Sequence, residues 1–156
     1  MHQIYSGGEV LFIAMQIEQN GAATYRKLAA KYPQFAGLLS GLATDEDAHY
    51  ATFAGLHRDA GKAGAWHEEE EAQAYLNRLA GSFVFEENAD PLAPFAAVKT
   101  LADVFDVAIG QERKSIDLYE AMLKVVRRAD EAKLVRQIIA EEHRHVADLT
   151  KAKGTA

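Results

Sequence analysis

The chain of 156 residues contains no cysteine. This absence excludes disulfide bonds, iron–sulfur clusters and zinc sites built from thiolates. Long apolar runs are also missing, since no segment approaches the roughly 18 consecutive apolar residues of a membrane-spanning helix. The residues after Met1 do not form a basic region followed by an apolar one, so we expect no secretory signal. These absences lead us to expect a cytoplasmic protein that does not enter a membrane.

Proline is scarce, occurring only at positions 33, 91 and 94, so few residues interrupt a helix. Apolar residues make up 49% of the chain and charged residues 26%, which suits one folded domain over residues 1–156. We expect residues 151–156 to be a frayed tail. The formal net charge of −6 argues against a surface that binds nucleic acid.

Helical periodicity dominates the chain. Ser6 and Glu9 form a capping-box pattern at the start of the first helix, and Pro33 ends that helix. Asp130 has the character of an N-cap for the last helix, which should turn Leu134 and Val135 inward. The predicted long helices cover residues 6–32, 34–60, 94–127 and 130–150, and a short helix with an acidic start covers 66–79.

Two helical segments contain the motif Glu-x-x-His, as Glu46-Asp-Ala-His49 and Glu142-His-Arg-His145. Each of the other two long helices carries one glutamate within its apolar stripe, Glu18 and Glu112. A core cannot hold four carboxylates unless cations neutralise them. This set of residues is the one that a four-helix bundle uses to hold two iron or manganese ions.

The spacing indicates that these side chains lie at one level. Glutamate and histidine three positions apart share a helical face. Residue 32, beside Pro33, is the midpoint between Glu18 and Glu46, and residue 127 is the midpoint between Glu112 and Glu142. Each half therefore folds into a hairpin with its polar residues level. The sequence predicts an all-α, ferritin-like four-helix bundle of two helical hairpins joined by a long crossover that contains a short extra helix.

Carboxylates combined with imidazoles suit iron or manganese, and would also accept zinc. The alternative is that these groups form buried salt bridges, but the apolar stripes contain no lysine or arginine to serve as partners. Tyr25 and Tyr119 each follow a stripe glutamate by seven residues. They either pack in the core or place a phenol near the metals, where it could hydrogen-bond a ligand carboxylate or donate an electron.

The remaining acidic and histidine side chains are expected at the surface. Asp45, Asp47 and Glu141 have the pattern of solvated helix faces, as do the acidic residues 68–71. The histidines other than His49 and His145 are expected at the surface or its boundary; they are His2, His57, His67 and His143.

At these residues the chain resembles the rubrerythrin family of the ferritin-like superfamily, over roughly residues 6–150. The resemblance is carried by Ile17-Glu18 followed by Tyr25, Leu42-Ala43 leading to Glu46 and His49, Gln111-Glu112-Arg-Lys-Ser-Ile-Asp-Leu-Tyr119, and Glu141-Glu142-His-Arg-His145. It implies a di-iron carboxylate centre. In that centre Glu46 and Glu142 would bridge the ions, Glu18 and Glu112 would be terminal ligands, and His49 and His145 would each bind one ion.

Two features depart from the family pattern. Rubrerythrins carry a rubredoxin domain with four cysteines, whereas this chain has none. They also have an additional carboxylate one turn from the glutamate of the third helix, where this chain has Ile109 and Ser115 as the neighbouring residues. The resemblance therefore does not extend to the movement of a metal ion, or to the efficient peroxide reduction, that depends on this additional ligand.

The resemblance implies redox chemistry of two iron ions with peroxide or dioxygen, as peroxide reduction or ferrous iron oxidation, in oxidative stress or iron handling. A separate protein or small molecule would then donate electrons, and the relatives imply a homodimer. Two alternatives remain open. One is a non-catalytic iron- or manganese-binding bundle for storage, sensing or stability, which includes a shell-forming iron store. The other is a partner-binding helical protein with an incidental metal site.

Overall fold

The computed structural model describes residues 5–60, 70–83, 85 and 88–156. Five α-helices and two short 3₁₀ segments make up its regular structure, and the described residues contain no strand. The helices are α1 (Gly7–Lys31), α2 (Ala36–Asp59), α3 (Glu70–Gly81), α4 (Leu101–Leu123) and α5 (Ala129–Lys153), with 3₁₀ turns at Pro33–Phe35 and Ala93–Phe95. The predicted all-α class is confirmed.

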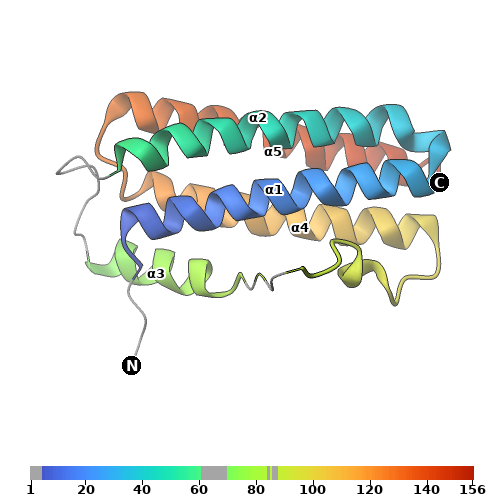
Figure 1. The fold of residues 1–156 in the computed structure, drawn as a ribbon, viewed down its shortest axis with the longest axis horizontal. Helices are drawn as coiled ribbons and strands as arrows, with labels where there is room; N and C mark the ends of the chain where they lie inside the picture. Colours follow the sequence, from blue (N-terminus) through green and yellow to red (C-terminus); the bar gives the residue numbers. More distant parts are fainter. Residues whose placement is uncertain (1–4, 61–69, 84, 86–87) are drawn as a thin grey trace.

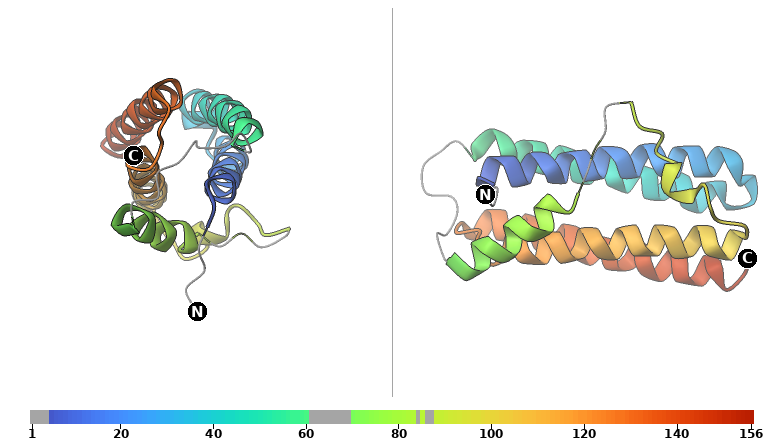
Figure 2. Two further views of the ribbon diagram at one scale, coloured as in Figure 1. Left: turned by 90° about the vertical axis from the view of Figure 1, so that its left-hand side faces the viewer. Right: turned by 90° about the horizontal axis from the view of Figure 1, so that it is seen from below.

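Four long helices form the bundle, and the end-on view shows them around a common axis (Figure 2). Helices α1 and α2 form one antiparallel hairpin, and α4 and α5 form the other (Figure 1). Between the hairpins in the sequence, α3 and the described residues that follow it lie along the outside of α1 and α4, with α3 at one end of the bundle and the residues before α4 at the other (Figures 1 and 2). This segment is the predicted crossover, and the predicted ferritin-like topology is confirmed.

Helix starts follow local capping chemistry. Ser6 and Glu9 form the predicted capping box, in which each side chain accepts a hydrogen bond from the backbone N–H of the other residue. The predicted start of the third long helix at residue 94 is wrong. Pro94 lies in the Ala93–Phe95 turn, and α4 begins only after Thr100, whose hydroxyl accepts from the N–H of Asp103.

Other predicted boundaries also need correction. Arg128, not Asp130, is the N-cap of α5, and Asp130 lies in the first turn of the helix, where a negative charge is favourable. The expected frayed tail is shorter than predicted, because α5 continues to Lys153 and buries Ala152. The short helix predicted for 66–79 is α3 where it is described, and its residues 66–69 lie outside the described part of the chain.

The apolar core is divided into two clusters along the bundle axis. Every long helix contributes to both clusters, with residues such as Val10 and Phe53 in the first and Leu28 and Phe105 in the second. On each helix, buried polar residues lie between its two contributions, and they include Glu18, Glu46, Glu112 and Glu142. The bundle therefore encloses one polar layer between two apolar ones.

Leu134 was predicted to face inward, but it is 38% exposed, so that prediction is wrong.

None of the helices in the described parts of the chain combines the length and apolar character that a bilayer-spanning segment needs.

Candidate metal centre

The polar layer brings together the six residues predicted as metal ligands. One glutamate comes from α1 and one from α4, and each Glu-x-x-His pair comes from α2 or α5. None of the six is more than 5% exposed; they are Glu18, Glu46, His49, Glu112, Glu142 and His145.

The six side chains form two overlapping groups of four. Within each group, one nitrogen or oxygen atom per residue lies within 4.8 Å of the others. The first group is Glu18, Glu46, His49 and Glu142, and the second is Glu46, Glu112, Glu142 and His145. Glu46 and Glu142 belong to both groups, so these two carboxylates stand between the two half-sites.

Among the described residues, only imidazoles supply basic groups to this cluster. The hydrogen bonds and ion pairs of the six residues, within the described part of the chain, involve no lysine or arginine. Oxygen Oε2 of Glu18 and Oε1 of Glu46 are buried and lack a hydrogen bond, although imidazole Nδ1 atoms lie 3.4 Å and 3.3 Å away. Orphaned carboxylate oxygens beside imidazoles are a donor set that fits divalent cations.

The pKa values of the buried carboxyl groups show the same shortage of positive charge. Burial raises the pKa of Glu46 well above its ordinary value, and the neighbouring carboxylates of Glu18 and Glu142 add to this. Burial and Glu142 raise the pKa of Glu112 to about 8, against the opposing effect of His145. Without metal ions, this cluster would hold extra protons.

The imidazoles respond in the complementary way. Burial alone lowers the pKa of His49, but its contacts with Glu142 and Glu18 outweigh this and raise the pKa to about 10. Burial likewise opposes protonation of His145, whose contacts with Glu112 and Glu142 raise its pKa to about 11. In the metal-free cluster both rings are therefore positively charged at neutral pH.

Each imidazole directs Nδ1 into the cluster and Nε2 outward. Nδ1 of His49 lies 3.0 Å from Glu142 Oε1, and Nε2 lies 2.7 Å from Glu141 Oε2. Nδ1 of His145 lies 3.1 Å from Glu142 Oε2, and Nε2 lies 3.1 Å from Asp45 Oδ2. The outer carboxylates accept from Nε2–H, which leaves Nδ1 as the atom available to a metal.

Asp45 and Glu141 are thus part of the site, and their prediction as solvated surface residues is wrong. Their side chains are partly exposed, 36% and 42%, but each holds a histidine of the opposite hairpin. A sequence signal exists, because each residue stands directly before the glutamate of its Glu-x-x-His motif. Each of these side chains contacts a histidine across the bundle, however, and residue spacing along a single helix does not reveal such a contact.

Tyr25 and Tyr119 join the cluster from its two ends. The hydroxyl of Tyr119 donates to Glu18 Oε1 over 2.5 Å, and that of Tyr25 donates to Glu112 Oε1. Each tyrosine therefore binds the lone glutamate of the other hairpin. Burial, reinforced by the adjacent glutamate, raises both tyrosine pKa values well above the ordinary one, so both phenols keep their protons. Of the two predicted roles, the contact with a candidate ligand carboxylate is observed.

Gly21 gives Glu46 the space that it occupies. A Cβ atom at position 21 would lie 2.6 Å from Glu46 Oε2, closer than real Cβ contacts allow. Glycine in a helix interior costs about 1 kcal/mol relative to alanine. This cost is offset by the room for a carboxylate at the boundary of the two half-sites.

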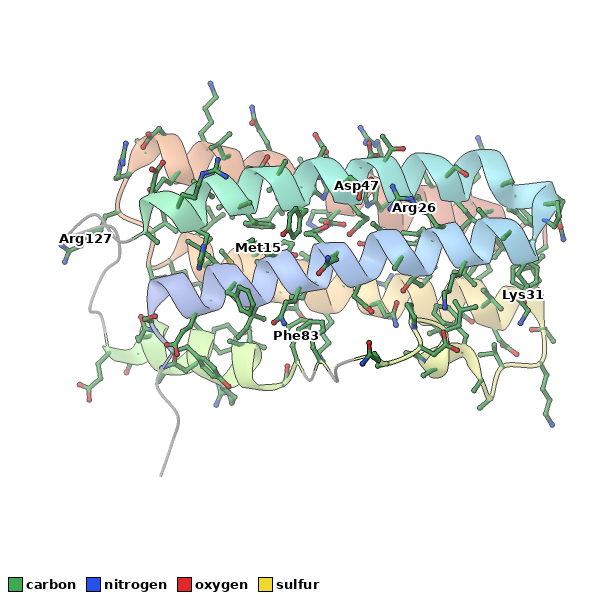
Figure 3. All side chains as sticks on the ribbon, in the orientation of Figure 1. Met15, Arg26, Lys31, Asp47, Phe83 and Arg127 are labelled. Atoms are coloured by element: carbon green, nitrogen blue, oxygen red, sulfur yellow. The ribbon has the colours of Figure 1, made fainter. Side chains whose placement is uncertain are left out.

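The other residues predicted at the surface lie away from the cluster. His143 is exposed and lies near Glu120 of α4. Asp47 pairs with Arg26 on the outer face of α1 and α2, where Figure 3 shows both side chains. His57 is partly buried and lies beside the ring of Phe12. His2, His67 and the acidic residues 68 and 69 fall outside the described residues.

Comparison with known proteins supports the fold independently. A sequence model of the rubrerythrin family matches residues 9–153. A crystal structure from Thermotoga maritima, described as a candidate ferritin-like diiron-carboxylate protein, is 23% identical to this chain and superposes with a TM-score of 0.71. The match covers 98% of this chain and 97% of that one. Among curated proteins, no sequence matches this chain significantly.

The outer carboxylates can be tested by removing their charge. We expect Asp45→Asn to weaken metal binding about 10- to 100-fold, because a neutral amide replaces the charged acceptor that orients the ring of His145. Competition with a coloured chelator measures this affinity. Asp47→Asn is the matched control, since Asp47 lies on the same helix but pairs with Arg26 outside the cluster. Equal affinities in the two variants would contradict this role of Asp45.

The space beside Gly21 can be tested by adding one carbon. We expect Gly21→Ala to weaken metal binding by about tenfold or more, because the Glu46 carboxylate must shift from its place between the two half-sites. In Gly41→Ala the new Cβ meets nothing within 4 Å. That control should gain up to about 1 kcal/mol in stability with unchanged metal affinity. Unchanged metal binding in Gly21→Ala would show that the space is incidental.

The pKa shifts predict how the metal-free protein responds to pH. The pKa values of Glu112, His49 and His145 are raised on folding. Their stabilising contribution is complete below the unfolded pKa values and is lost as the pH rises through the folded ones. The free energy of unfolding should therefore fall from about pH 5 until the pH passes the highest of these folded pKa values, about 11, and each group should contribute on the order of 1 kcal/mol per pH unit between its unfolded and folded pKa.

Chemical denaturation across this range measures that dependence. Metal ions replace the protons, so the metal-loaded protein should show a weaker decline or none. A metal-free protein whose stability is constant or rises over the same interval would contradict the proposed charge state of the cluster.

Proposed function

The chain belongs to the rubrerythrin family, and on that premise we propose that it is a di-iron carboxylate protein that reacts with peroxide or dioxygen. The reaction is peroxide reduction or ferrous iron oxidation, in oxidative stress or iron handling. The observation that carries the proposal is the pair of buried four-residue groups sharing Glu46 and Glu142. Manganese or zinc could occupy the same ligands.

The two groups support the proposed ligand roles. Glu46 and Glu142 would be shared by two ions, with Glu18 and His49 completing one half-site and Glu112 and His145 the other. Each imidazole would bind through Nδ1, since its Nε2 faces an outer carboxylate. When bound, two ferrous ions would supply two electrons in total, one from each ion, which is the number needed to reduce one peroxide to water.

The protein contributes an enclosure with apolar ends. Apolar clusters close the polar layer on both sides along the bundle axis, which limits the access of bulk water. Asp45 and Glu141 hold the imidazole rings in one orientation and favour one tautomer. A redox centre held in this way does not have to reorganise its ligands against solvent.

The two tyrosines are placed to hold protons at the edge of the cluster. The phenol protons of Tyr25 and Tyr119 lie against carboxylate oxygens of Glu112 and Glu18. Their raised pKa values keep these protons in place at neutral pH. These two hydroxyls are therefore in position to donate hydrogen bonds to negative charge that develops on the carboxylates of Glu112 and Glu18.

The remaining features of the proposal concern partners. Because the chain has no cysteine, electrons must come from a separate protein or a small reductant. We further propose a homodimer in the cytoplasm that binds neither nucleic acid nor membrane. These statements rest on the family and on the net charge of −6.

The test is an anaerobic titration of the metal-free protein with ferrous iron, followed by peroxide. We expect about two ferrous ions per chain and a visible ferric absorption after the addition of peroxide. Glu142→Ala should lose both, because both half-sites share that residue. Glu120→Ala, on the exposed face of α4, should retain both.

Two other outcomes would redirect the proposal. If two ferrous ions bind and peroxide leaves them ferrous, the redox assignment fails and a metal-binding role in storage, sensing or stability replaces it. If wild-type protein binds fewer than two ions, the di-iron assignment itself fails.

A further inference from the structure

A pocket with a volume of about 240 Å³ opens beside the cluster, between α1, α4 and the crossover. Phe83 of the crossover lies beneath α1 in Figure 3, on this side of the bundle. One ion pair and one hydrogen bond tie the crossover to helices α1 and α4. Lys27 of α1 pairs with Asp90 at 3.2 Å, and Lys114 of α4 donates to the carbonyl of Ser82 at 3.0 Å.

The inner end of the pocket is formed by the cluster itself. Glu46, Glu112 and Tyr25 are among its lining residues. Gly21 also lines it, and the absence of a side chain there leaves Glu46 Oε2 accessible from the pocket. A molecule in this pocket could therefore approach two candidate metal ligands directly.

The outer walls are mixed, with apolar side chains of the crossover and α1 beside the polar side chains of Asn20, Thr24 and Gln111. Phe83 and Phe85 lie nearly parallel, with ring centroids 6.4 Å apart, and Ile17 and Pro94 add further apolar surface. The ammonium of Lys114 sits 4.2 Å from the centroid of Phe83, so its charge is already engaged by the ring and by a carbonyl. Small-molecule sites in proteins combine such apolar walls with a few convergent polar groups.

The volume exceeds what a small inorganic oxidant requires. A water molecule occupies about 30 Å³ in the liquid, and dioxygen and hydrogen peroxide are of similar size. A pocket several times larger, with aromatic walls, is suited to a body of several carbon atoms. The carboxylates at its inner end disfavour an anion and accept hydrogen bonds from a hydroxyl group.

We propose that this pocket binds an uncharged organic co-substrate, with its alkyl or aromatic body against Phe83 and Phe85 and a terminal hydroxyl or hydroperoxyl group toward Glu46 and Glu112. The proposal rests on the proposed function, because the co-substrate would meet the metal ions through those carboxylates. It goes beyond that function in assigning a binding site for an organic molecule.

The binding test uses protein loaded with zinc, which cannot turn over a peroxide. The probe is 2-phenyl-2-propanol, followed by titration calorimetry or by NMR of the ligand. We expect saturable binding to the wild type, weakened by about tenfold or more in Asn20→Trp, whose indole would fill the pocket. Asn20 lines the pocket, whereas Gln19 does not, so Gln19→Trp is the matched control and should bind as the wild type does.

The second measurement compares cumene hydroperoxide, which has the same carbon body, with hydrogen peroxide as oxidants of the ferrous protein. We expect Asn20→Trp to lower the rate with the organic peroxide relative to hydrogen peroxide by about tenfold. Phe85→Ala, which shortens one wall, should shift the ratio in the same direction and serves if Asn20→Trp does not fold.

The proposal is overturned if the wild type does not bind the probe, or if Gln19→Trp weakens binding as much as Asn20→Trp does. It is also overturned if Asn20→Trp slows both peroxides equally, since the pocket would then be a general passage to the metals. Elemental analysis of the same samples reads the metal content separately. A protein without metal contradicts the proposed function, whereas a loaded protein without probe binding contradicts only this inference.

Discussion

The structure depends on the burial of four carboxylates at one level of a helical bundle. Two imidazoles are the only basic groups that contact them among the described residues, and two carboxylate oxygens have no hydrogen bond. Unneutralised charge of this kind costs several kcal/mol per group in an apolar interior. The cluster must take up protons or metal ions, and its nitrogen and oxygen donors suit metal ions better.

This constraint explains features that would otherwise be liabilities. The core is split into two apolar clusters, so the protein gives up continuous hydrophobic packing to accommodate the polar layer. Gly21 weakens α1 and gives space to Glu46. Asp45 and Glu141 hold the histidines of the opposite hairpin, so the metal centre and the docking of the two hairpins are coupled. Metal binding would therefore stabilise the whole bundle.

Much of this arrangement was predictable from the sequence, because it follows from local periodicity. The position of Glu46 and His49 on one helical face, and the level of Glu18 across the hairpin, need only the geometry of a helix and a turn. The start of α4 at Leu101, the outer contacts of Asp45 and the pocket beside Gly21 were not predicted. They depend on contacts between segments distant in sequence, and on a crossover whose path no periodic pattern describes.

The most direct test of the central claim is a crystal structure of the iron-loaded protein with anomalous scattering measured on both sides of the iron absorption edge. The account predicts two anomalous peaks, one in each four-residue group, with Glu46 and Glu142 contacting both ions and each imidazole bound through Nδ1. A fully ordered cluster without anomalous density, with its carboxylates paired to one another through shared protons, would contradict it.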